Sequence, residues 1–567
     1  MISGTKTLCH RNRRITMNQS SKQKLRRPLY PLAIILILFY FVMLSVILKA
    51  KPIKGVTIME KNWSENVIIQ NGKAVEPVFT VDYTIPKSES YRFDAEWDVL
   101  DPGFITGLVG KDSTGEILFA FTAAEVTYQN DCTVKAGQLE MEYHILANEN
   151  DYREFAKAYE LFHTEEDLDS MIKGIDYASM NTDGEWPLRL SLSIHEMHTP
   201  SKAAYYLLIP IGLITIVLLF VLYRSYQPSF ANLKEGMDSI GIRYVLTVTL
   251  IVFSQSSAII LLSFHARDWA ISIGQNLSFL MMILGVELVG FPAISLLCRN
   301  IPKTPIPKRT LGFGNLLLFI LMSAGLAGAG MIVGNLFHNM VTLPFNNHTN
   351  ALSELMMNSG FPMRVLTVAI LAPIFEELIF RKILIDRMSK FGEFAAILTS
   401  GLMFGLFHGN FSQFFYTAAF GSLWAFLYVR TGKVIYTIIC HMVINMSTSA
   451  VTVFLLRKLG EFVADPSDQN TLIAAMSQSE EASLYITLYS VWSILLTVVC
   501  VAGFIIFLVF FFTGKLRLRI REGGATHDEV LRAFVKSKYM WLFFFACIGL
   551  FLMNYLPGII AYYRSIN

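Results

Sequence analysis

Long apolar runs recur along the chain, and most have the length of a membrane-spanning helix. A hydrocarbon core of roughly 30 Å requires about 20 apolar residues per helix. The first run is Tyr30–Leu48. The others lie at 203–223, 244–264, 275–297, 312–337, 363–385, 395–409, 414–429, 434–455, 484–513 and 540–563. The pattern predicts an all-α polytopic membrane bundle of about eleven spans.

Residues 51–202 interrupt this pattern. Stretches such as Phe79–Ile85 and Leu188–Ile194 alternate apolar and polar side chains, which is typical of half-buried strands. One helical pattern runs through Asp151–Phe162. About 150 residues are enough for one globular domain. We therefore expect an inserted extracytoplasmic β-rich domain, with a β-sandwich as the favoured architecture.

The composition excludes a simple soluble enzyme and a disordered protein. Of the 567 residues 53% are hydrophobic and only 16% charged, whereas soluble domains carry about 25% charged residues. The net charge of +3 hides an asymmetry. The first thirty residues hold eight Lys/Arg and no acid, while residues 51–200 hold 27 Asp/Glu against 12 Lys/Arg, a charge of −15. Such segregation predicts that the two segments lie in different compartments.

Basic flanks remain in the cytoplasm, so the N-terminus is expected there, before a retained anchor. The basic loops Arg299–Arg309 and Lys515–Lys538 then fall on the same side, and the loops 338–362 and 456–483 fall outside. A multi-pass protein of a plasma membrane, of bacterial origin, is expected. The predicted segments are a cytoplasmic N-terminus (1–29), an anchor (30–50), the outer domain (51–202), transmembrane helices (203–300), a membrane core (310–455), an outer loop (456–483) and C-terminal helices (484–567).

Ionisable residues inside membrane spans are costly and mark functional sites. The run Pro373–Arg381 holds two adjacent carboxylates and an arginine. Glu377 and Arg381 are four residues apart, so they share a helix face and can pair. Glu376 points about 100° round the helix and needs another partner. Pro373 disturbs the helix just before the carboxylates.

Two further polar motifs follow in later spans. Phe404 and His408 are four residues apart, as are His441 and Asn445. At membrane depth these groups can pair only with one another or with water. A buried network that merely joins helices is one interpretation, but two histidines and an unpaired glutamate favour a catalytic site.

Hydrolysis is the chemistry that these groups could perform. A buried carboxylate can accept a proton from water, and a histidine can position that water. An imidazole and an amide on one helix face could stabilise an oxyanion. Metal binding by Glu376, His408 and His441 is the competing use. The chain contains no H-E-x-x-H zinc motif, and His195-Glu196-Met197-His198 is one residue short of it.

The polar residues form three motifs along the chain: E-E-x-x-x-R (Glu376, Glu377, Arg381), F-x-x-x-H (Phe404, His408) and H-x-x-x-N (His441, Asn445). Three such motifs in this order resemble those of the CPBP family of intramembrane endopeptidases, which includes CaaX proteases and bacteriocin-processing Abi proteins. The resemblance covers about residues 312–455. It implies that Glu376 and His408 activate a water, that His441 and Asn445 form the oxyanion hole, and that Glu377 and Arg381 support the site. It also implies a glutamate-type peptidase, formerly classed as a metalloprotease, that needs no cofactor; a divalent metal such as zinc is the alternative.

A non-catalytic membrane scaffold or sensor of the same fold, binding a partner through its outer domain, is the alternative function. A transporter is a third, but the sequence shows no inverted repeat. The membrane and a peptide or protein substrate are the expected partners, with no nucleic acid. The substrate stays open between a prenylated protein, a leader peptide and a membrane-embedded peptide. Only Cys132 lies in residues 51–202, so no disulfide framework is expected there.

Overall fold

A computed structural model shows two compact units, one formed by Met1–Lys49 with Lys202–Asn567 and the other by Ala50–Ser201. The structure describes residues 19–48, 53–198, 202–345, 355–463 and 469–566, apart from gaps at 77, 86–88, 100–104, 113, 124–126, 135–136, 162–164, 174, 176, 178–182, 227–229, 275, 358, 461 and 520–523.

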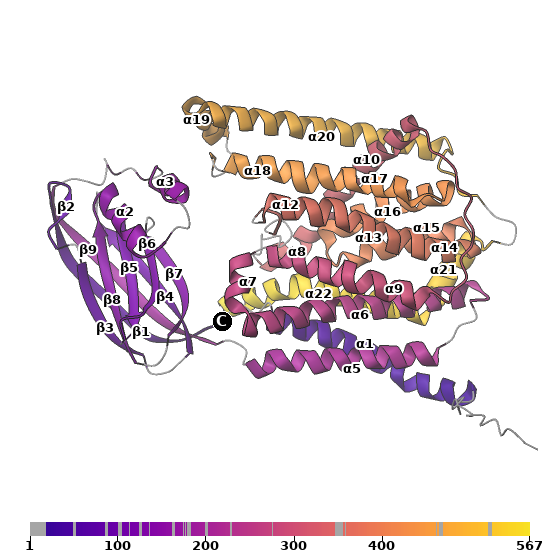
Figure 1. Cartoon of the computed structure of the whole chain (residues 1–567), viewed down its shortest axis with the longest axis horizontal. Helices are drawn as coiled ribbons and strands as arrows, with labels where there is room; N and C mark the ends of the chain where they lie inside the picture. Colours follow the sequence, from indigo (N-terminus) through magenta and orange to yellow (C-terminus); the bar gives the residue numbers. More distant parts are fainter. Residues whose placement is uncertain are drawn as a thin grey trace, which may run out of the picture. The chain divides into compact units, whose positions relative to one another are not determined.

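The first unit is helical, and its long helices lie side by side with roughly parallel axes (Figure 1). Its elements are α1 (Gln19–Leu48), α5 (Lys202–Ser225), α6 (Leu233–His265), α7 (Arg267–Ile273), α8 (Asn276–Met282), η1 (Ile283–Gly290), α9 (Phe291–Cys298), α10 (Phe313–Thr342), η2 (Leu343–Phe345), α12 (Phe361–Arg364), η3 (Val365–Leu371), α13 (Ala372–Glu377), η4 (Leu378–Ile383), α14 (Leu384–Met388), η5 (Ser389–Phe391), α15 (Glu393–Phe407), α16 (Phe411–Thr431), α17 (Val434–Asn445), η6 (Met446–Thr452), α18 (Val453–Gly460), α19 (Gln469–Gln478), α20 (Glu480–Phe512), α21 (His527–Lys536) and α22 (Lys538–Ile566).

Eight helices in the described part of the chain are long and apolar enough to cross a membrane, which makes this a multi-pass membrane protein. They are Pro28–Leu48, Lys202–Ser225, Leu233–His265, Asn276–Cys298, Phe313–Phe345, Val434–Gly460, Glu480–Phe512 and Lys538–Ile560. The full number of about eleven spans is not confirmed. The predicted spans at 363–385, 395–409 and 414–429 do not reach this standard and stay predictions.

These three segments differ from the long helices for physical reasons. The run 363–385 is divided among short α-helical and π-helical pieces, because Pro373 cannot donate a backbone hydrogen bond and π turns flank it in η3 and η4. The helix α15 has 15 residues and is therefore about 22 Å long, less than the thickness of the hydrocarbon core. Polar side chains such as Gln413 and Ser422 interrupt the apolar face of α16.

The helix α10 packs against both α16 and α20. Its approach to α20 is close because glycines face each other. A Cβ atom on Gly503 would lie 1.8 Å from the carbonyl oxygen of Leu321, and one on Gly325 would lie 2.1 Å from the Phe504 nitrogen. Small residues allow membrane helices to approach in this way. On the α16 side, the Trp424 indole donates a hydrogen bond to Ser323 on α10 (2.8 Å).

The unit Ala50–Ser201 contains two antiparallel sheets, with strand orders β2-β1-β9-β4-β7 and β3-β8-β5-β6. The alternating stretches found in the sequence lie within β3 and β9. In β8, Leu139, Met141 and Tyr143 are buried and the residues between them face outward, as the period of two requires. The elements are β1 (Ile53–Gln70), β2 (Lys73–Ala74), β3 (Val78–Ile85), β4 (Glu89–Val99), β5 (Ile105–Asp112), β6 (Ile117–Ala123), β7 (Thr127–Val134), β8 (Gly137–Leu146), α2 (Glu149–Ala158), α3 (Glu165–Lys173) and β9 (Gly184–His198).

Candidate active site

Glu377 and Arg381 form the predicted pair. Glu377 is the last residue of α13, and Arg381 lies one turn later in η4. Arg381 Nε lies 3.0 Å from Glu377 Oε2, and both side chains are fully buried. Arg381 also donates from Nη2 to the carbonyl of Gly421 (3.3 Å), and its guanidinium stacks over the Phe404 ring at 4.3 Å. The arginine therefore joins the α13–η4 segment to α15 and α16.

His441, on α17, faces both carboxylates. Its Nδ1 lies 3.1 Å from Glu377 Oε1, a hydrogen bond, and its Nε2 lies 3.8 Å from Glu376 Oε2, which is too long for one. Because Arg381 holds Glu377 in the ionised form, the proton on Nδ1 is the one that points at Glu377, and Nε2 is left facing Glu376. The imidazole packs on the Trp424 ring at 4.6 Å between centroids, which fixes its plane.

His408 follows the last residue of α15, and Phe404 fixes its orientation. His408 Nδ1 donates to the carbonyl of Phe404 (2.9 Å), and the two rings meet edge to face at 5.0 Å. The His441 ring meets the same Phe404 ring edge to face at 5.9 Å. Phe404 is thus shared by both imidazoles, and this contact explains the four-residue spacing of the F-x-x-x-H motif.

Asn445 lies one turn after His441 on α17. Its Nδ2 donates a hydrogen bond to the carbonyl of Val368 in η3 (2.9 Å). One amide hydrogen is therefore committed to η3, and the second is the one that a substrate oxyanion could accept from. The bond also ties α17 to the segment that leads into the two carboxylates.

A third carboxylate lies beside the predicted ones. Glu287, in η1, is buried, and its Oε2 has no hydrogen-bond partner among the described residues. The segment η1 packs against α13, and Glu287 is close enough to Glu376 for their charges to interact. The only signal in the sequence for this neighbour is a carboxylate inside the apolar run 275–297, and no local spacing links it to Glu376.

Glu376, His408 and His441 are the side chains that a bound metal would use. In the described parts of the chain no three His, Cys, Asp or Glu side chains are arranged to hold one. His441 directs Nδ1 at Glu377 and His408 directs Nδ1 at a backbone carbonyl, as metal-bound histidines usually do, so Nε2 of each ring is the atom that could bind a metal. A zinc site takes at least three protein ligands. That the site works without a metal stays a prediction.

The fold and this cluster define a polytopic helical membrane protein with glutamate, arginine and histidine side chains buried together between its helices. Residues 358–447, which include all three motifs, match the family model described as Type II CAAX prenyl endopeptidase Rce1-like. This match confirms the resemblance found in the motifs.

Two relatives also match part of the chain. The chain is 32% identical over 113 residues to the membrane peptidase YdiL of Bacillus subtilis (strain 168), which is 20% of this chain and 45% of that protein. It is 35% identical over 104 residues to CAAX prenyl protease 2 of Homo sapiens, which is 15% of this chain and 32% of that protein. The alignments thus span less than half of either relative.

Proposed function

We propose that this protein is an intramembrane endopeptidase that cleaves peptide bonds of membrane-associated peptides or proteins. The observation that carries the proposal is the placement of His441 between two carboxylates, the buried Glu377, which is paired with Arg381, and the slightly exposed Glu376, which lies 3.8 Å from Nε2. The family match over residues 358–447 and the names of the two relatives support a peptidase.

In the proposed mechanism Glu376 is the general base. It takes a proton from a water while the oxygen of that water attacks the scissile carbonyl, and the carbonyl electrons move onto the oxygen. Glu376 then returns the proton to the departing amine as the tetrahedral intermediate collapses. His408 positions the water with Nε2, since its Nδ1 is held by Phe404.

His441 and Asn445 stabilise the oxyanion in this mechanism. Asn445 offers its second amide hydrogen. His441 donates from Nε2 in its doubly protonated form, which the Glu377 carboxylate at Nδ1 stabilises, as a buried carboxylate does for a catalytic histidine. Glu377 and Arg381 thus act by positioning and charging His441 rather than by touching the substrate.

The mechanism is tested by cleavage of lipidated and unmodified membrane-associated peptides with purified protein in detergent. Glu376→Gln keeps the shape but cannot accept the proton, so we expect activity to fall about 10²–10⁴-fold. Asn445→Ala should lower it about 10²–10³-fold, as for one lost oxyanion donor. The exposed Glu480 supplies a matched control, because Glu480→Gln makes the same change outside the cluster.

Each result bears on a different claim. Chelators should leave the wild type active, and stoichiometric metal with chelator-sensitive turnover would overturn the assignment of Glu376 as a metal-free base. Full activity in both Glu376→Gln and His441→Ala would remove the peptidase function. A folded wild type that cleaves no peptide but retains a membrane partner would instead favour the scaffold or sensor alternative.

We also propose that the segments 363–385, 395–409 and 414–429 cross the membrane, which gives eleven spans with the N-terminus in the cytoplasm and Ala50–Ser201 outside. The basic loops at 299–309 and 515–538 support this orientation. Single cysteines introduced in a cysteine-free variant at 116 and at 532 test it. A membrane-impermeant maleimide added to intact cells should label the first and not the second; the reverse labelling would invert the topology.

A further inference from the structure

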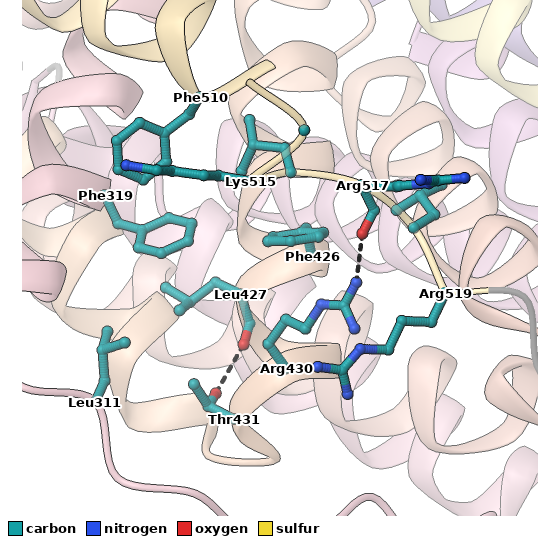
Figure 2. Close-up of a pocket in the computed structure, with 13 residues that line it drawn as sticks. Leu311, Phe319, Phe426, Leu427, Arg430, Thr431, Phe510, Lys515, Arg517 and Arg519 are labelled. Carbon is teal, nitrogen blue, oxygen red and sulfur yellow. Dashed lines mark hydrogen bonds between the residues drawn. The ribbon is translucent and has the colours of Figure 1, made fainter. Parts of the chain in front are cut away.

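A pocket of about 830 Å³ lies where α10 begins, α16 ends and the chain leaves α20 (Figure 2). None of the motif residues lines it. The spans of α10 and α20 have their ends at Phe313 and Phe512, and the lining residues 514–519 follow directly after the second. The pocket therefore lies at the boundary between the apolar helices and the polar segments that connect them.

Four cations line the pocket: Arg430, Lys515, Arg517 and Arg519. Among the described residues one carboxylate, Glu393, meets them, and both of its oxygens are used. Oε1 accepts from Arg430 Nη1 (2.9 Å), and Oε2 accepts from the backbone N–H of Arg519 (2.7 Å). Among the described residues the side chains of Lys515, Arg517 and Arg519 form no ion pair.

Two of the four cations, Arg430 and Arg519, lie close together, whereas the Lys515 amine lies beside Phe510 on the other side of the pocket. Figure 2 shows the guanidinium of Arg519 turned toward that of Arg430, and Arg430 also donates from Nη2 to the carbonyl of Arg517 (2.7 Å). The positive charges of Arg519 and Arg309 act on Arg430. Like charges repel at this range, so a bound anion would stabilise the arrangement. Guanidinium groups bind phosphate oxygens with two parallel hydrogen bonds.

Aromatic rings form the other wall. The rings of Phe319 and Phe426 stack with centroids 6.5 Å apart. The Arg430 guanidinium lies over Phe426 at 4.8 Å, and Lys515 Nζ lies over Phe510 at 4.7 Å. A free inorganic anion would make no favourable contact with an apolar wall that continues into membrane-spanning helices. An amphiphile with an anionic head and apolar chains matches both halves of the pocket.

We propose that this pocket binds the headgroup of an anionic phospholipid, with the phosphate at Arg430 and Arg519 and the acyl chains along α10 and α20. Basic pockets between helix ends recognise lipid headgroups by this combination of charge and depth. The proposal does not depend on peptidase activity, because no residue of the Glu376 cluster contributes to the pocket.

Native mass spectrometry of the purified full chain tests it, with phosphatidylglycerol or phosphatidylcholine added to the detergent. The variant Lys515→Gln/Arg517→Gln/Arg519→Gln removes three charges and leaves the Arg430–Glu393 pair in place. We expect the wild type to retain phosphatidylglycerol at least about tenfold more than this variant, and to show no preference for phosphatidylcholine. The control Arg532→Gln/Lys536→Gln/Lys538→Gln removes three exposed charges from the next segment and should bind as the wild type does.

Three outcomes would overturn the proposal. Equal loss of lipid in both triple variants would show that the lipid is held by the overall positive charge of these segments and not by the pocket. Equal retention in both would show that the pocket does not hold the lipid. Displacement of the lipid by inorganic phosphate at equal concentration would identify a site for free phosphate instead. Circular dichroism and size-exclusion chromatography of each variant establish that it is folded.

Discussion

Glu377 uses both of its carboxylate oxygens inside the bundle. Oε2 pairs with Arg381, and Oε1 accepts from His441. Removing one partner of a buried pair leaves the other charge without compensation, whereas replacing both with apolar side chains is often neutral. The stabilising role of Glu377 and its role in positioning His441 can therefore be separated.

Glu377→Gln should lower the free energy of unfolding by about 3–5 kcal/mol, because the Arg381 charge stays buried and unpaired. The double variant Glu377→Leu/Arg381→Met should recover most of that stability. It should not recover activity, because His441 Nδ1 has lost its acceptor. Thermal unfolding in detergent and peptide cleavage measure the two effects. A double variant as unstable as Glu377→Gln would show that the pair is not the main source of the loss.

The sequence identified most of the polar residues of the candidate site, but it did not identify the residues on other helices that they contact. The four-residue spacing predicted the Glu377–Arg381 pair, which the structure confirms at 3.0 Å. It also predicted that Glu376 needs a separate partner, and His441, 65 residues later, lies 3.8 Å from it. The catalytic roles of Glu376, His408, His441 and Asn445 stay predictions. Glu287 was not recognised as a neighbour of this site, because nothing in its own segment points to α13.

At the level of elements, the contact between α10 and α20 depends on glycine. A Cβ atom on Gly503 would overlap the backbone of α10, which cannot move aside without separating the helices. The sequence shows two apolar helices with scattered glycines, and it gives no sign of which glycine faces which helix. Packing of the two backbones decides this.

Gly503→Ala should destabilise the protein by about 1–3 kcal/mol, as for overpacking a tight contact. Gly314, near the start of α10, is a matched control, because nothing lies within 4 Å of the Cβ that an alanine would add. Gly314→Ala should be neutral or stabilising by up to about 1 kcal/mol. The measurement is thermal unfolding of both variants in the same detergent. Equal melting temperatures would contradict the close approach.

For the whole molecule, the division into two units carries its own prediction. The unit Ala50–Ser201 has its own buried cluster, which includes Ile105, Val109, Tyr152 and Phe155. Its acidic charge of −15 favours solubility. Expressed alone, residues 52–201 should be soluble and rich in β-structure, with or without reductant, since Cys132 is its only cysteine. An unfolded or mainly helical circular dichroism spectrum would contradict this.

The sequence by itself determined the apolar helices, the alternating strands of the second unit and the Glu377–Arg381 pair. These features follow from properties of a single segment: its length, its period and the spacing along one helix face. The tertiary structure decided which segments meet. It placed His441 against the carboxylates of α13, Glu287 beside Glu376, and Arg430 beside residues 515–519. These contacts join residues 64 or more positions apart. The packing of whole helices determines them, because no pattern within one segment specifies which distant helix its apolar face will contact.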